Sequence, residues 1–343
     1  MKYPNYLKPN GTIGLFASSF GANTEPYKSR LESAISQLKS LGYNIVSEGD
    51  IFGYYQGASA PKEARAKAFE SLYKNPKVDL LWSVGGGEWL MEMLPYIDFE
   101  ALKKYPPKYV MGYSDNTHLT MLMNTLLDTA AIYGQHTTEF GMMPWDVSLS
   151  QALEIMTGQR HIQHSFPMYE GKGAEQPDPL GGYILNEPTR WVNLRNESEI
   201  HLSGRLIGGC IDVFLSHLGT PLDQVHTFIE KYKDDGIIWF MEACDLNLFG
   251  LKRALWQLKL AGWFKYTKGF IFGRHLNASP VIDLDQYQTT MDILGDLNVP
   301  IIMDADFGHI PPTFTLISGA YIEIKSKDGK GTIQTLQKEQ RGE

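Results

Sequence analysis

The sequence predicts an α/β protein, with a parallel, flavodoxin- or Rossmann-like sheet in its N-terminal part and a mixed α/β or β-rich domain after it. Two observations support this prediction. Short apolar runs alternate with amphipathic stretches over the first third of the chain, which is the pattern of a parallel sheet flanked by helices. Residues 78–84 (VDLLWSV) are apolar almost throughout, as expected of a parallel strand covered on both faces.

The elements before residue 75 follow in order. Residues 12–17 and 44–46 predict two strands, and residues 27–41 between them predict a helix that Gly42 ends. The apolar positions of this helix are Leu31, Ala34, Ile35, Leu38 and Leu41. Ser59 and Pro61 mark the start of a second helix. Its predicted buried positions are Ala64, Ala68, Phe69 and Leu72.

The strand at residues 78–84 runs straight into three glycines, Gly85 to Gly87. A further short strand is predicted at residues 109–112, a helix over about residues 117–127, and a strand at residues 131–133. We assign residues 1–145 to an N-terminal α/β domain on this basis.

The rest of the chain divides in two. Proline, glycine, histidine and asparagine are scattered between about residues 144 and 202 without a sustained period, so we interpret residues 146–200 as a crossover linker and an irregular loop. Residues 201–343 then predict a mixed α/β or β-rich domain, for which the sequence defines no strand order, ending in a polar stretch after Lys325. Its expected strands are residues 204–209, 236–241, 269–273, 301–302 and 321–324. A helix is expected over about residues 249–260, with Leu251, Ala254, Leu255 and Leu258 facing inward.

Composition excludes several classes of protein. The 343 residues are 43% hydrophobic and 20% charged, which is ordinary globular usage and enough for two domains. A net charge of -8 without a basic cluster argues against nucleic acid and against an anionic membrane as partners. Cys210 and Cys244 make neither a disulfide framework nor a CxxC pair. The sequence has no signal-like or membrane-spanning apolar run, so we expect a cytoplasmic protein. We also expect no metal and no cofactor.

The most informative local motif is GYSDNT, residues 112–117, because it lies where a buried strand is predicted to turn into a helix. A serine at such a turn has its Oγ lifted clear of the sheet, and the next amide points at a developing oxyanion. The alternative is an ordinary helix N-cap. The generic hydrolase elbow also has glycine two places after the serine, where this chain has Asn116.

A serine nucleophile needs a base, and the base needs a carboxylate to orient it. Among the nine histidines, His309 is best placed, since it follows an apolar run on a loop stiffened by Gly308 and two prolines. Glu242 ends a predicted buried strand, where a carboxylate is costly unless it is paired. His161 and His164 have no third ligand nearby, so we expect no metal there.

The triple glycine allows three interpretations. It fails both standard phosphate-binding patterns. It could be a plain tight turn. As a glycine-rich loop at the carboxyl end of a parallel strand, it would lie on the sheet edge where ligands bind, and it could lend an amide to the same oxyanion as Asp115.

Taken together, these motifs resemble the LD-carboxypeptidase family of serine peptidases, which includes the microcin C self-immunity peptidases. The matching features are the glycine loop, GYSDxT, the strand ending in Glu242, Ile207-Gly208-Gly209, and a late Gly-His before Thr315, Leu316 and Gly319. They run in the family's order from residue 11 to residue 319. The resemblance implies Ser114 as nucleophile, His309 as general base and Glu242 as its orienting acid. It also implies an oxyanion hole made by the amides of Asp115 and the Gly86 region.

The length near 340 residues, and the stretches at residues 60–65 and 73–76, are more similar to the immunity branch than to the shorter murein enzymes. The resemblance places Trp191 in a loop where that branch carries an aromatic residue that stacks on a nucleotide base, with core packing as the alternative. Gly87 and Asp212 are further expected substrate contacts, and we expect a homodimer.

Two departures concern the acyl substrate. The family usually carries Asn-x-Asn where this chain has Cys210 and Asp212, and the basic residues that the best-known immunity enzyme carries after the acid are absent after Glu242. The expected substrate is therefore a small peptide-like molecule or an aminoacyl-nucleotide. A murein tetrapeptide remains an alternative, as does a non-catalytic two-domain protein that binds a small anion in the same cleft.

Overall fold

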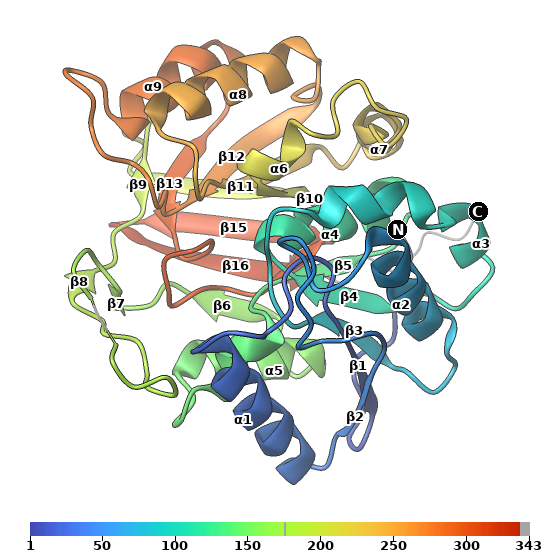
Figure 1. Cartoon of the computed structure of the whole chain (residues 1–343). Helices are drawn as coiled ribbons and strands as arrows, with labels where there is room; N and C mark the ends of the chain where they lie inside the picture. Colours follow the sequence, from blue (N-terminus) through green and yellow to red (C-terminus); the bar gives the residue numbers. More distant parts are fainter. Residues whose placement is uncertain (175, 337–343) are drawn as a thin grey trace. The chain divides into compact units, whose positions relative to one another are not determined.

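The computed structural model describes residues 1–174 and 176–336, and the chain divides into two compact units (Figure 1). Unit 1 consists of Met1–Arg160, Lys172–Ile184 and Phe314–Leu316. Unit 2 consists of His161–Gly171, Leu185–Thr313 and the residues from Ile317 onward. Within the described residues, no helix is long and apolar enough to cross a membrane.

Unit 1 is built on a six-stranded sheet with the order β14-β5-β4-β3-β1-β2. Strands β1 to β5 run parallel, and their order is that of flavodoxin-like folds, so the predicted N-terminal fold is confirmed. The strand order reverses between β1 and β3, and ligands bind at this point in open α/β sheets. The strands are β1 (Thr12–Phe16), β2 (Asn44–Ser47), β3 (Leu80–Ser83), β4 (Tyr109–Gly112), β5 (Ala131–Tyr133) and β14 (Leu316–Ser318).

The helices of unit 1 form where apolar side chains recur at helical spacing. Two of the helices predicted from the sequence pack as follows: α1 packs against η3, and α4 packs against β4 and β5. The helical elements are α1 (Tyr27–Ser40), α2 (Lys62–Lys74), η1 (Leu90–Tyr96), α3 (Phe99–Leu102), η2 (Ser114–Asn116), α4 (Thr117–Thr125), η3 (Thr137–Gly141) and α5 (Val147–Met156).

Two predicted core positions in these helices are wrong. Leu41 is 52% exposed, because α1 ends at Ser40 and Leu41 lies beyond its last turn. Ala64 is exposed as well, because the inward stripe of α2 runs through Arg65, Phe69 and Leu72. The buried Arg65 guanidinium is neutralised by Glu92 and donates to the Ser18 carbonyl at 2.7 Å.

The interpretation of residues 146–200 as irregular is wrong for α5. Asp146 accepts a hydrogen bond from the Ser148 amide at 2.8 Å and so caps the helix. Four apolar side chains at helical spacing are buried: Leu149, Ala152, Ile155 and Met156. The helical period of these apolar residues is short and is flanked on both sides by prolines and glycines, so it is hard to recognise in the sequence.

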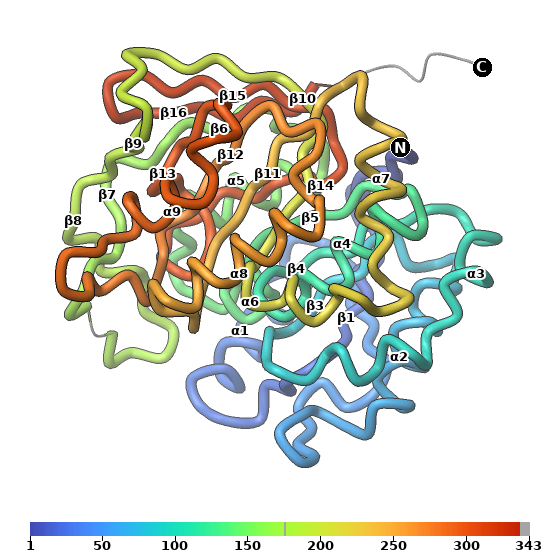
Figure 2. Tube along the Cα trace, turned by 90° about the horizontal axis from the view of Figure 1, so that it is seen from above, coloured from blue at the N-terminus to red at the C-terminus, as the bar shows by residue number. Residues whose placement is uncertain are grey.

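Unit 2 contains an eight-stranded mixed sheet with the order β6-β16-β15-β10-β11-β12-β13-β9 (Figures 1 and 2). The strands β10 to β13 are parallel and form its centre, and antiparallel strands flank them. The strands are β6 (Ile162–His164), β9 (Val192–Asn193), β10 (Glu199–Cys210), β11 (Ile237–Glu242), β12 (Thr267–Gly273), β13 (Ile301–Ala305), β15 (Tyr321–Lys327) and β16 (Lys330–Leu336).

Helices and a small second sheet complete unit 2. The helix α8 buries Leu251, Ala254, Leu255 and Leu258, as predicted, and packs against α9. The polar stretch after Lys325 is strand as far as Leu336, because the β15–β16 ladder is made by the backbone; residues 337–343 lie outside the described residues. The remaining elements are β7 (Met168–Tyr169), β8 (Glu187–Pro188), α6 (Ile211–Phe214), α7 (Val225–Lys231), α8 (Leu248–Leu260), α9 (Gln286–Leu294) and η4 (Gly295–Leu297).

Candidate active site

Ser114 lies at the turn between the buried strand β4 and the helix α4. Its φ is 58°, in the left-handed region that side chains other than glycine rarely adopt, so the backbone is strained here. A Cβ on Gly112 would lie 2.8 Å from the Asn116 Cβ, so the turn needs a glycine at that position. Asn116 holds the N-cap position of α4, and Ser114 begins the preceding η2 turn. The strand–turn–helix geometry of a nucleophile elbow is therefore present.

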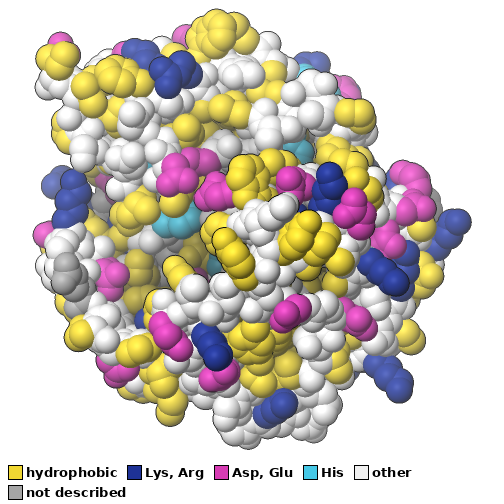
Figure 3. Space-filling view, viewed as in Figure 1, with side chains coloured by type: hydrophobic (Ala, Val, Ile, Leu, Met, Phe, Trp, Pro, Cys, Tyr) yellow, Lys and Arg dark blue, Asp and Glu magenta, His cyan; other side chains and the backbone are white. Residues whose placement is uncertain are grey.

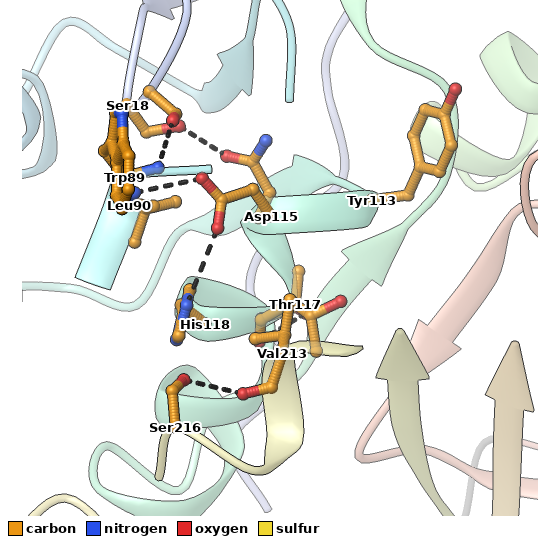
Figure 4. Close-up of polar contacts among 12 residues, drawn as sticks. Ser18, Trp89, Leu90, Tyr113, Asp115, Thr117, His118, Val213 and Ser216 are labelled. Atoms are coloured by element: carbon orange, nitrogen blue, oxygen red, sulfur yellow. Dashed lines mark hydrogen bonds and ion pairs between the residues drawn. The ribbon is translucent and has the colours of Figure 1, made fainter. Parts of the chain in front are cut away.

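The residue after Ser114 ties the elbow to the start of η1. The Asp115 carboxylate accepts a hydrogen bond from the Leu90 amide at 2.9 Å, and its other oxygen lies 3.5 Å from His118 Nε2 (Figure 4). The side chain of Tyr113 points away from Asp115 in the same view. Burial raises the pKa of Asp115 to about 6, although the Leu90 amide opposes this shift.

The glycine loop after β3 reaches the elbow. A Cβ on Gly86 would lie 3.2 Å from the Ser114 Oγ, so a side chain at residue 86 would crowd the serine. Gly87 has a φ of 135°, and a Cβ there would lie 2.4 Å from the Ser19 Oγ. The Phe20 amide donates to the Gly86 carbonyl at 2.9 Å. The loops after β1, β3 and β4 thus meet at the point where the strand order reverses.

Sequence reasoning missed a histidine and a glutamate beside this elbow. His136 is 5% exposed, and its Nδ1 lies 3.8 Å from the Glu139 carboxylate. The signal was available, since His136 follows β5 closely, just as Ser114 follows β4, and carboxyl ends of parallel strands share one sheet edge.

Two members of the predicted triad are brought together in unit 2. Glu242 is the last residue of β11 and only 1% exposed, and its Oε2 lies 2.8 Å from the His309 Nδ1. Gly308 has a φ of 102°, and a Cβ there would lie 3.0 Å from the Glu242 Cβ. Burial disfavours the imidazolium, but Glu242 and Cys244 outweigh it and hold the pKa of His309 above its usual value.

A buried ion pair supports the loop that carries His309. The Arg274 guanidinium donates to Asp306 at 2.9 Å and to the Pro312 carbonyl at 2.9 Å, on either side of His309. Trp191 completes this cluster, because its indole N–H donates to the second Asp306 oxygen at 2.7 Å.

The loop position expected for Trp191 does not expose its side chain. Its side chain is 2% exposed, and a Cβ on Gly331 would lie 2.0 Å from its ring. The core-packing alternative therefore describes Trp191 in this structure. Polar residues surround Trp191 in the sequence, but β9 places the residues that follow Trp191 at the edge of the large sheet.

Asp212 organises the turn that follows Glu242. Its carboxylate accepts hydrogen bonds from the amides of Cys244, Asp245 and Leu246 at 2.9 to 3.0 Å. The Cys210 thiol donates to the same carboxylate at 3.2 Å. A contact of Asp212 with substrate stays a prediction.

The chain is similar in sequence to two named proteins and in fold to a solved structure. The microcin C7 self-immunity protein MccF of Escherichia coli is 25% identical over 327 residues, covering 93% of this chain and 91% of that protein. The probable murein peptide carboxypeptidase of Bacillus subtilis is 22% identical over 334 residues, covering 96% and 94%. The structure of an MccF-like protein from Bacillus anthracis superposes with a TM-score of 0.82 at 22% identity, covering 98% of this chain and 100% of that one.

The family assignment rests on both halves of the chain. Residues 13–134 match the LD-carboxypeptidase N-terminal domain, and residues 203–324 match the LD-carboxypeptidase C-terminal domain. Together the two matches cover well over half of the sequence. The chain belongs to the LD-carboxypeptidase family of serine peptidases.

Proposed function

We propose that Ser114, His309 and Glu242 carry out the serine carboxypeptidase reaction of the family in this chain. The observation that carries the proposal is the 2.8 Å contact between His309 Nδ1 and the buried carboxylate of Glu242. With the proton on Nδ1 donated to Glu242, the Nε2 lone pair is left to act as the base. The elbow geometry of Ser114 supports its role as the nucleophile.

The proposed reaction has two similar halves. The Ser114 Oγ attacks the amide carbonyl while His309 takes its proton, and the amides of Gly86 and Asp115 stabilise the oxyanion. His309 then gives the proton to the leaving amine as the C–N bond breaks, which leaves an acyl-enzyme. Water repeats the sequence and releases the carboxylic acid. The Glu242 carboxylate stabilises the imidazolium that forms in each half.

We propose a small peptide-like or aminoacyl-nucleotide substrate, as for the immunity branch. In its support, relatives with the same fold have been solved as MccF with glutamyl sulfamoyl guanosine, and as an MccF-like protein of Streptococcus pneumoniae with AMP. The proposal does not rest on base stacking by Trp191, because that side chain is buried. Gly87 and Asp212 remain the proposed substrate contacts.

A murein tetrapeptide is the second candidate substrate. It is favoured by the similarity to the Bacillus subtilis relative and to the murein tetrapeptide carboxypeptidase of Pseudomonas aeruginosa, which is 22% identical over 258 residues. Family membership favours either enzyme over a non-catalytic binding protein.

A cytoplasmic homodimer that contributes to antibiotic resistance is also part of the proposal. On the face drawn in Figure 3, lysine and arginine are scattered among acidic and neutral side chains, which is in keeping with a small-molecule substrate rather than a polyanion.

Hydrolysis assays on both substrate classes test the proposal. The purified protein should release the amine product from an aminoacyl-sulfamoyl nucleoside faster than D-alanine from a murein tetrapeptide. The Ser114→Ala variant should be inactive on both, since loss of a triad member typically costs ~10⁴ to 10⁶ in rate. Faster turnover of the tetrapeptide would assign the murein reaction instead, and full activity of the alanine variant would remove Ser114 from its role.

A further inference from the structure

The buried cluster around His136 lies directly behind the elbow and has no part in the proposed reaction. The His136 ring stacks on the ring of Tyr113, the residue before Ser114, with 4.3 Å between the ring centres. The Tyr113 hydroxyl donates to Glu139 at 2.8 Å, and burial raises the pKa of that carboxyl. A Cβ on Gly86 would lie 3.3 Å from the His136 Cε1 and 3.2 Å from the Ser114 Oγ, so one glycine borders both residues.

The Nε2 of His136 faces the backbone of the elbow and the side chain of Asn116. It lies 3.2 Å from Asn116 Nδ2 and 3.1 Å from the Tyr113 carbonyl, and the Tyr113 amide donates to it at 3.4 Å. The orientation of the Asn116 amide is set independently. Its nitrogen donates to the Gly85 carbonyl at 2.9 Å, and its oxygen accepts from the Ser18 hydroxyl at 2.8 Å.

These contacts bear on where the imidazole proton lies. Two donors face the His136 Nε2, the Asn116 amide group and the Tyr113 backbone N–H, and one acceptor faces it, the Tyr113 carbonyl. The two donors favour Nε2 as the acceptor and the proton on Nδ1, the nitrogen that faces Glu139 at 3.8 Å. Through Asn116, His136 of this tautomer joins the glycine loop to the residue before Ser114.

We propose that His136 is a positioning residue for the reaction: its Nε2 lone pair, acting through Asn116, holds Ser114 and the Gly85–Gly86 loop in the geometry for acyl transfer. The inference rests on the proposed role of Ser114. His136 does not take a proton from substrate in this role. Without the His136 Nε2 as acceptor, the elbow at Ser114 and the Gly85–Gly86 loop can move apart. A displacement of about 1 Å can cost 100-fold in rate.

Two substitutions separate the acceptor from the shape of the ring. His136→Phe keeps a flat ring against Tyr113 but removes the acceptor, whereas His136→Gln can place its amide oxygen near the position of Nε2 but loses the stacking. Steady-state kinetics on the better substrate should show kcat lowered by about 100-fold in the phenylalanine variant, with KM changed by less than about threefold. The glutamine variant should recover at least about tenfold of that loss.

The rate of covalent labelling by a serine-directed phosphonate gives a second readout, because it reports the alignment of Ser114 without substrate binding. We expect it to fall in parallel with kcat in His136→Phe. If that variant does not fold, Asn116→Ala removes the other end of the same hydrogen bond and should show the same fall in kcat and labelling. Where both fold, the losses of the single variants should not add in the double variant.

Failure of the positioning role and failure of the proposed function give different results. Near wild-type kcat and labelling in His136→Phe, or a glutamine variant as slow as the phenylalanine variant, would overturn the positioning role while leaving Ser114 as nucleophile. A Ser114→Ala variant that is neither slowed nor protected from labelling would instead overturn the proposed function on which the inference rests.

Discussion

At the scale of single residues, the proposed chemistry depends on side chains held in costly states. Ser114 adopts a left-handed backbone conformation, and the Glu242 carboxylate is almost fully buried. Both would be disfavoured without a compensating partner, which for Glu242 is His309 at 2.8 Å. A strained backbone and a buried carboxylate are both features found at functional sites.

The strain at Ser114 predicts a difference between two inactive variants. Ser114→Gly should be more stable than Ser114→Ala by about 1 kcal/mol in the free energy of unfolding, because only glycine adopts a positive φ at little cost. Urea denaturation of both variants measures this. The exposed Ser36 in α1 is the matched control, where the order should reverse because glycine weakens helices. An alanine variant at residue 114 as stable as the glycine variant would argue against a strained elbow.

Glu242→Gln should lower kcat/KM by ~10⁴ through loss of the correct His309 tautomer, as for the orienting acid of other serine peptidases. The surface pair of His201 and Glu323, also 2.8 Å apart, provides the control, and Glu323→Gln should leave the rate unchanged. A loss below about tenfold in Glu242→Gln would mean that another carboxylate orients His309.

The pH profile carries a further prediction about the same pair. The base must be neutral to act, and Glu242 raises the pKa of His309, so kcat/KM should rise with pH through a value above the ordinary histidine pKa of about 6.5. In Glu242→Gln the burial of His309 remains without the opposing charge, so the rising limb should move to lower pH. A limb that stays in place would show that a group other than His309 controls the rate.

At the scale of secondary-structure elements, most of unit 1 could be predicted from its sequence. Buried parallel strands are nearly continuous apolar runs, and each of the five predicted strands is present. The helix α5 was missed because its period spans only ten residues between prolines and glycines. Short edge strands such as β9 carry no apolar pattern of their own, since their partners and not their side chains hold them in the sheet.

The burial of Trp191 beside Asp306 leads to a prediction opposite to a substrate-stacking role. Trp191→Phe should lower the free energy of unfolding by about 1 to 3 kcal/mol, because it leaves a buried Asp306 oxygen without its donor. Turnover of the aminoacyl-nucleotide and of the tetrapeptide should fall by the same factor. Trp256, which is 55% exposed on α8, is the control, and its phenylalanine variant should lose little stability. Selective loss of nucleotide turnover in Trp191→Phe would restore the stacking role.

At the scale of the whole molecule, residues far apart in the sequence supply the proposed site. The pairing of Glu242 with His309 could be anticipated from a carboxylate at a strand end and from the resemblance, although 67 positions separate the two residues. The cluster of His136, Glu139 and Tyr113 belongs to no motif, and its one signal in the sequence is that β4 and β5 are parallel strands whose carboxyl ends share a sheet edge. Burial was harder to predict than secondary structure, as Trp191 and Leu41 show.

Ser114 is proposed as the nucleophile, and His309 as the base that activates it. The most direct test of these roles is mass spectrometry of the intact protein and its peptides after reaction with a fluorophosphonate. One adduct is expected, on Ser114 alone, and its rate of formation should fall by at least ~10³ in a His309→Gln variant of unchanged melting temperature. An adduct on a different residue would contradict the role of Ser114 as nucleophile. Labelling of the His309 variant at the wild-type rate would contradict the role of His309 as its base.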